Sequence, residues 1–231
     1  MGSPVSRVSF KSVAVLGVVT VSLLVIGCAP KPGTPGPTPT TSTSTTLPWS
    51  EPNGEWTFFS MTCSVNVLGT KYYFPQDVSV NVEAPLTVNQ GETFFMMVAP
   101  GPFVIPTDVQ GYNLSYMSSV RIVFPLSPNV EFVDSVMSAG INMGSGYPGL
   151  QISGTNMVYT VPGPFAPGAT VQMPKVRLEL TATGAPGSTV DVRMTSLSSV
   201  ARVQGVSIPN TCTPDAPNPL FWTTTILGAA E

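Results

Sequence analysis

The sequence contains no histidine and few charged residues. Only 9% of the 231 residues are Asp, Glu, Lys or Arg, whereas soluble proteins average about 25%. Without His, catalysis by Ser-His-Asp or Cys-His groups is excluded, and strong metal ligands are limited to carboxylates and thiolates. Nine basic against twelve acidic residues lack the basic surplus of a nucleic-acid-binding protein. We expect no cofactor, no metal and no nucleic-acid partner.

Amphipathic helical segments are missing too, because no capped stretch of ten residues repeats apolar positions with a period near 3.6. From Trp56 onward apolar and polar residues alternate, which is typical of strands with one buried face. The alternating segments include Val78–Val82, Val120–Phe124, Met157–Val161, Val176–Leu180 and Val190–Met194. Turn sequences such as Ala166-Pro167-Gly168 separate them. The pattern predicts one all-β domain over residues 54–231, an antiparallel β-sandwich of about 8–11 strands.

Residues 1–27 have the pattern of an export signal. Arg7 and Lys11 precede the apolar run Val13–Ile26, whose fourteen residues are too few to cross a bilayer core of about 30 Å. The run ends in Val25-Ile26-Gly27-Cys28, which resembles the bacterial lipobox.

The lipobox resemblance implies that the Cys28 thiol receives diacylglycerol and that cleavage follows between Gly27 and Cys28. The protein would then be anchored by lipid, palmitate included, on the extracytoplasmic face of the cell membrane. The alternative is an ordinary secreted protein in which Cys28 is lost or free. Gly2 and Ser6 also fit an N-myristoylation pattern, but that modification belongs to cytosolic proteins and an export signal follows here.

Residues 28–53 follow as a linker. Between residues 29 and 50 there are six Pro, seven Thr, three Ser and two Gly. Such a composition cannot bury a core, so we expect an extended, disordered spacer between the lipid and the domain. The Thr/Ser runs also suit O-glycosylation, with a bare spacer as the alternative.

Cys63 and Cys212 remain for the domain, and an exported chain matures where disulfides form. Cys63 alternates in phase with Val65 and Val67, and Cys212 shares its parity with Val206 and Ile208. Both thiols are expected to face the core, joined between the first strand and one of the last. The alternative is two unpaired buried thiols.

One apolar segment does not alternate. Phe94-Phe95-Met96-Met97-Val98 is apolar throughout, and Phe103 follows shortly after. A strand that is apolar on both faces must be covered on both. Either the Pro-rich segment 99–107 covers the outer face, or Phe94, Phe95, Met96, Met97 and Phe103 form an apolar binding groove. Its rim would then include Tyr112, Tyr116, Tyr147 and Trp222.

Other candidates for chemistry are weak, and we expect no enzyme. Glu131 and Asp134 are three residues apart on a predicted strand, which places them on opposite faces. Gly140–Gly149 is rich in glycine but lacks Lys, so it is predicted to be a mobile loop rather than an anion site. Pro100-Gly101-Pro102-Phe103 recurs as Pro162-Gly163-Pro164-Phe165, by duplication or by convergent turn chemistry.

The segments Gly163–Thr170, Val176–Leu180 and Thr183–Ser188, with Cys63 early and Asn218-Pro219 late, resemble secreted Ig-like β-sandwich proteins of actinobacterial, especially mycobacterial, envelopes. Some relatives of that type occur in mycobacteriophage genomes. The resemblance implies a non-enzymatic, lipid-anchored envelope protein whose sandwich mediates contacts with an unknown protein or lipid. Two alternatives remain: a binder or carrier of apolar envelope lipids, and a prophage-encoded lipoprotein acting in superinfection exclusion.

Overall fold

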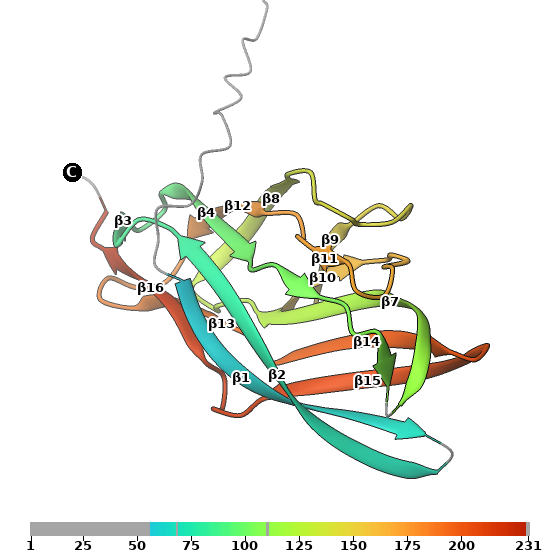
Figure 1. Ribbon diagram of the computed structural model, residues 1–231. Helices are drawn as coiled ribbons and strands as arrows, with labels where there is room; N and C mark the ends of the chain where they lie inside the picture. The colour runs from blue at the N-terminus through green and yellow to red at the C-terminus, as the bar shows by residue number, and fades with distance from the viewer. Residues whose placement is uncertain (1–55, 68, 110, 230–231) are drawn as a thin grey trace, which may run out of the picture. The chain divides into compact units, whose positions relative to one another are not determined.

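The computed structural model describes residues 56–67, 69–109 and 111–229, and within them every regular element is a strand (Figure 1). These residues fall in one compact unit. The predicted signal peptide 1–27, the lipidation site Cys28 and the linker 28–53 lie outside the described residues. In the part described, no helix is long and apolar enough to cross a membrane.

Eleven strands form one main sheet, with the order β8-β12-β4-β2-β1-β15-β14-β7-β10-β9 and with β6 beside β7. Five short strands form two small sheets, β11-β5 and β13-β16-β3. Every pairing is antiparallel except β16 with β3. The strands are β1 (Trp56–Val67), β2 (Thr70–Glu83), β3 (Thr87–Asn89), β4 (Thr93–Pro100), β5 (Phe103–Val104), β6 (Asp108–Val109), β7 (Tyr112–Pro125), β8 (Val130–Met137), β9 (Gly149–Ser153), β10 (Asn156–Val161), β11 (Thr170–Val171), β12 (Val176–Ala182), β13 (Thr189–Arg193), β14 (Ser196–Val203), β15 (Val206–Pro214) and β16 (Leu220–Leu227).

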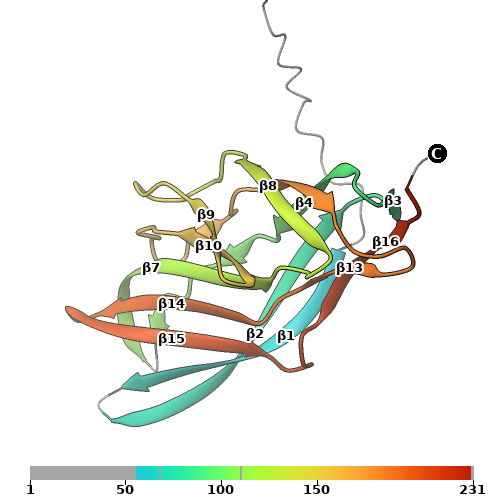
Figure 2. The same cartoon turned by 180° about the vertical axis from the view of Figure 1, so that it is seen from behind.

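The long β1–β2 hairpin joins the two layers of the sandwich. The end of β2 (Val80–Glu83) pairs with β4 in one layer, whereas Met61–Val65 of β1 pairs with β15 in the other. Figures 1 and 2 show this hairpin running between the group that contains β4, β12 and β8 and the group that contains β14, β15 and β7. The predicted antiparallel β-sandwich is confirmed, but the described residues form sixteen strands rather than the 8–11 expected, because several short strands of two or three residues add to the long ones.

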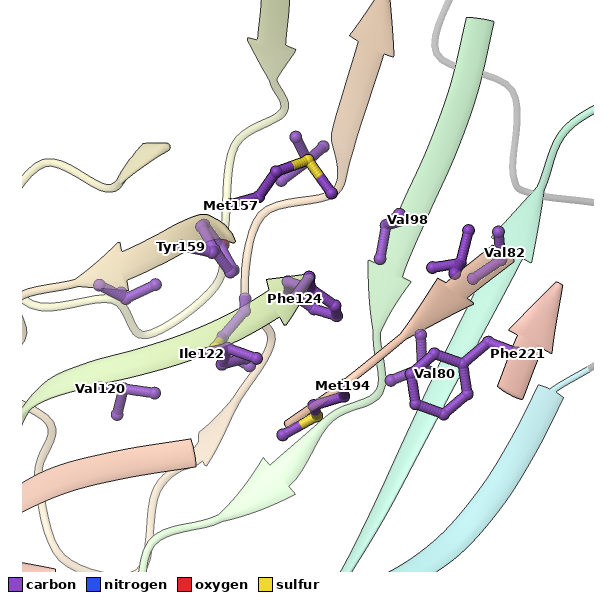
Figure 3. Close-up of a cluster of buried hydrophobic side chains, with 14 of the residues drawn as sticks. Val80, Val82, Val98, Val120, Ile122, Phe124, Met157, Tyr159, Met194 and Phe221 are labelled. Atoms are coloured by element: carbon purple, nitrogen blue, oxygen red, sulfur yellow. The ribbon is translucent and has the colours of Figure 1, made fainter. Parts of the chain in front are cut away.

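The core lies between these layers. Val98 of β4 and Leu178 of β12 face Phe124 of β7 across a void of about 20 Å³, and Figure 3 shows Val98 and Phe124 pointing into the same space. Alternation along β12 is complete, since Val176, Leu178, Leu180 and Ala182 are all buried.

A buried tyrosine crosses this core. The Tyr159 hydroxyl donates a hydrogen bond of 3.0 Å to the carbonyl oxygen of Pro174. Burial raises the pKa of Tyr159 above its ordinary value, so the group stays neutral and remains a donor.

Cys63 and Cys212 form a disulfide across the β1–β15 ladder, where they are directly opposed. Both residues are fully buried, as the alternation indicated. The parity argument was wrong for Val206, which is 60% exposed. Val206 begins β15 beside the tight turn at Gln204 and Gly205, at the last pair of the β14–β15 ladder.

Backbone hydrogen bonds tie the Gly140–Gly149 segment, which was predicted to be a mobile loop, to the segments beside it. Ile141 and Gln172 exchange two backbone hydrogen bonds, and the Gly146 N–H donates to the Gly163 carbonyl at 3.0 Å. Gly144 has φ +74°, and a β-carbon there would overlap the Pro164 carbonyl oxygen. Glycine is required here because the two segments approach closely.

Gly144→Ala is therefore expected to lower the free energy of unfolding by about 3 kcal/mol, from left-handed strain and a forced backbone shift together. Gly187→Ala is the matched control, since Gly187 has φ +85° but open space around its would-be β-carbon. It should cost only about 1 kcal/mol. Urea unfolding measures both, and equal losses would show that packing against Pro164 is unimportant.

The two Pro-Gly-Pro-Phe segments adopt different backbones. Gly163 has φ +81°, whereas Gly101 is outside the left-handed region. Their aromatic residues nevertheless meet, since the Phe103 and Phe165 rings lie 6.5 Å apart, edge to face. The different conformations favour convergent turn chemistry over duplication.

Candidate functional site

The side chains of the apolar strand β4 lie on two different faces of the sheet. Phe94 and Met96 lie in the core, at 4% and 1% exposure, and are not available to a partner. Phe95 and Met97 lie on the outer face, and Phe95 is 45% exposed. Segment 99–107 therefore does not cover this face, which corrects the first interpretation of the sequence.

Phe95 and Met97 of β4 share an outer face with two valines of β8, and the polar side chains of β12 stand between them. We call Phe95, Met97, Val133 and Val136 the apolar outer face. Val133 and Val136 are 50% and 42% exposed. The ladder places Met97, Arg177 and Val136 in one row across the three strands. The two valines were not predicted from the sequence, because only the sheet order places β8 and β4 on either side of β12.

Acidic side chains accompany this face. The ladder opposes Glu131 to Thr181 and Asp134 to Glu179, and the register shifts between them. Val133 is the extra residue of this β-bulge, so Glu131 and Asp134 share the outer face. The prediction that they point to opposite faces was wrong, because it assumed an uninterrupted strand.

One cation lies in the middle of the face. The Arg177 guanidinium carbon stands 5.2 Å from the centre of the Phe95 ring, a cation–π geometry. Aromatic residues, Met and Arg are the types that are enriched in protein interfaces. Their combination here is typical of a protein-docking surface.

A separate cavity of about 240 Å³ lies between the two layers. It is covered by the strap, our name for residues Pro100–Pro106. Its wall is mostly apolar, and includes Val80, Met117, Val120, Ile122, Phe124, Met173, Met194 and Leu197. Figure 3 shows Val80, Ile122 and Met194 among the side chains of this region.

The strap is fixed at both ends. The Gly101 N–H donates a 2.7 Å hydrogen bond to the Ser79 carbonyl, and the Ile105 N–H donates one of 2.9 Å to the Ala169 carbonyl. Phe103, half-buried, lines the cavity from the strap. Of the five apolar candidates, Phe103 alone borders the cavity, and the predicted rim residues Tyr112, Tyr116, Tyr147 and Trp222 do not line it.

The cavity wall carries a polar pair from two neighbouring strands. Asn210 of β15 and Ser199 of β14 are 8% and 4% exposed, and the Asn210 Nδ2 donates to Ser199 Oγ at 3.3 Å. Asn210 Oδ1 lies 3.8 Å from Cys212 Sγ, but a disulfide sulfur has no hydrogen to donate. Sequence analysis missed Asn210, although its parity with Ile208 and Cys212 was a signal.

The described residues contain no group of three or more Cys, Asp or Glu that could hold a metal ion. The Arg193–Asp191 ion pair at 2.9 Å joins two partly exposed side chains beside β16. Such pairs stabilise surfaces weakly.

No family model matches the chain, and no curated protein is significantly similar to it. Among solved structures, a protein of Corynebacterium diphtheriae described as membrane-anchored has a TM-score of 0.55 and 19% identity. The likeness covers 76% of this chain but only 38% of that one. At this identity it establishes the fold alone, an antiparallel β-sandwich.

Two further likenesses are more distant. A cohesin module from a Clostridium perfringens glycoside hydrolase has a TM-score of 0.37 at 9% identity, covering 64% of this chain and 96% of that one. The C-terminal domain of a Streptococcus agalactiae AgI/II polypeptide has a TM-score of 0.35 at 12% identity, covering 69% and 59%. Neither supports an argument about this chain.

Proposed function

We propose that this chain is a non-enzymatic protein of the cell envelope, anchored by lipid on Cys28, whose sandwich binds a protein through the apolar outer face. The observation that supports this most is the solvent exposure of Phe95 on β4 and of Val133 and Val136 on β8, the two strands that flank β12. Exposed apolar side chains that gather in one place mark binding surfaces. That a protein described as membrane-anchored has the same fold agrees with this proposal.

The charges indicate the kind of partner. Glu179 lies between Phe95 and Asp134, and Glu131 lies on β8 beside them, so the complementary surface has Lys or Arg next to apolar groups. The anionic headgroups of a bilayer would be repelled by the same carboxylates. A protein partner therefore fits this face better than a membrane does.

The two alternatives have less support. A carrier of envelope lipids needs a pocket of about 300–1,000 Å³, and the cavity of about 240 Å³ is smaller. Superinfection exclusion by a prophage lipoprotein rests on the family resemblance alone. Its test is the genomic neighbourhood, where lysogeny genes would favour it.

Photo-crosslinking in intact cells tests the protein-docking role. Benzoylphenylalanine in place of Phe95 is expected to yield one discrete protein adduct, whereas the same group at Tyr147, which is 91% exposed, should not. Val136→Asp should lower the yield of that adduct about tenfold, because it places a charge on the apolar outer face. Val104→Asp is the matched control, since Val104 is 63% exposed on the strap.

The proposal is contradicted if position 95 gives no adduct, or gives the same adducts as position 147. It is contradicted equally if Val104→Asp lowers the yield as much as Val136→Asp. High salt should also weaken the crosslink, since charges at the rim of an interface are screened.

A further inference from the structure

We propose that the cavity beneath the strap binds a small, neutral, apolar molecule that carries a hydrogen-bond donor, of the chemical class of the medium-chain alcohols. This inference does not depend on the protein-docking role of the outer face, which lies on other residues.

The size of the cavity sets the size of the ligand. A protein cavity of about 150 Å³ lined by aliphatic side chains binds benzene. By proportion, about 240 Å³ holds about ten non-hydrogen atoms. The methionines Met117, Met173 and Met194 line the wall, and unbranched thioethers repack around ligands of different shape.

The wall of the cavity contains a hydrogen-bond acceptor that lacks a donor. Asn210 is more than nine-tenths buried and lines the cavity. Its Nδ2 is directed to Ser199 Oγ, whereas its Oδ1 has no N–H or O–H donor among the described residues. A buried carbonyl oxygen without a donor costs about 1–3 kcal/mol, and a ligand hydroxyl would satisfy it.

The charges exclude an anionic ligand. Among the described residues, Asp77 is the charged one that lines the cavity, and no Lys or Arg lines it. A carboxylate would lose its hydration without gaining a counter-ion, and it would face Asp77 at the exposed side. Entry is available beside Phe58 and Val104, which line the cavity yet are 77% and 63% exposed.

The test uses the mature chain from residue 29, exported behind a signal peptide without a lipobox, so that no detergent is present. The protein is labelled with ¹³C-methyl methionine and titrated with 1-octanol. The NMR signals of the Met117, Met173 and Met194 methyl groups are expected to shift until the cavity is saturated. The signals of Met61 and Met96, which are buried outside the cavity, should not move. Octanoate, of equal chain length, should bind at least tenfold more weakly.

A variant isolates the polar contact. Asn210→Leu should weaken octanol binding about tenfold, the equivalent of one buried hydrogen bond, and leave the binding of octane unchanged. The proposal is overturned if octanol shifts none of the three cavity methionines, or if octanoate binds as well as octanol. The comparison of octanol with octanoate in the unmodified protein stands even if Asn210→Leu does not fold.

Discussion

Replacing both Cys63 and Cys212 with alanine is expected to lower the free energy of unfolding by about 5 kcal/mol. The disulfide closes a loop of 149 residues, so its loss returns a large conformational entropy to the unfolded chain. Domains of this kind are stable by about 5–15 kcal/mol in total. The double variant should therefore be close to unfolding at ambient temperature.

Urea unfolding of the oxidised protein and of the double variant measures this loss. The control is the neighbouring ladder pair Ser64 and Thr211, replaced together by alanine. Surface changes of that kind cost about 0.5 kcal/mol each, so a similar loss for the two pairs would show that the disulfide contributes little. Thiol titration of the denatured, unreduced domain should find neither Cys63 nor Cys212 free.

Cys28→Ala is expected to abolish lipid attachment completely. If Cys28 carries the diacylglycerol, alanine offers no sulfur to receive it, and the cleavage that follows lipidation should fail as well. The chain should then keep residues 1–27 and run as a heavier precursor. Metabolic labelling with an alkyne-tagged palmitate, together with the intact mass of the purified protein, measures both effects.

Thr20→Ala is the control for this variant, because Thr20 lies in the same apolar run but outside the lipobox. It should leave labelling and processing unchanged. Persistent label on the Cys28→Ala protein would place the lipid elsewhere and remove the anchoring part of the proposed function. The docking face and the cavity would be unaffected by that outcome.

The fold was predictable because strand alternation is a local property. Val176, Leu178 and Leu180 alternate with polar residues in the sequence and are buried in the structure. The Cys63–Cys212 pair was predictable for the same reason, since each thiol shares the phase of buried neighbours on its own strand.

The candidate sites were only partly predictable. The sequence shows that Phe94–Val98 is apolar throughout, but it does not show which face of this strand is covered. The structure places Phe95 and Met97 on the surface and Phe94 and Met96 in the core. The bulge at Val133, which brings Glu131 and Asp134 to one face, leaves no local signal in the sequence.

The sequence by itself determined the class of fold, the pairing of the two domain cysteines and the expectation of an export signal with Cys28 at its end. Each of these depends on neighbouring residues alone, through alternation, composition or a short motif. Only the tertiary structure decided the apolar outer face and the cavity beneath the strap. Both depend on which strands become neighbours: β12 between β8 and β4 creates the face, and the packing of β2 and the strap over β7, β14 and β15 forms the cavity beside Asn210. Strand order depends on how the whole chain buries its apolar residues together, so no local sequence pattern predicts it.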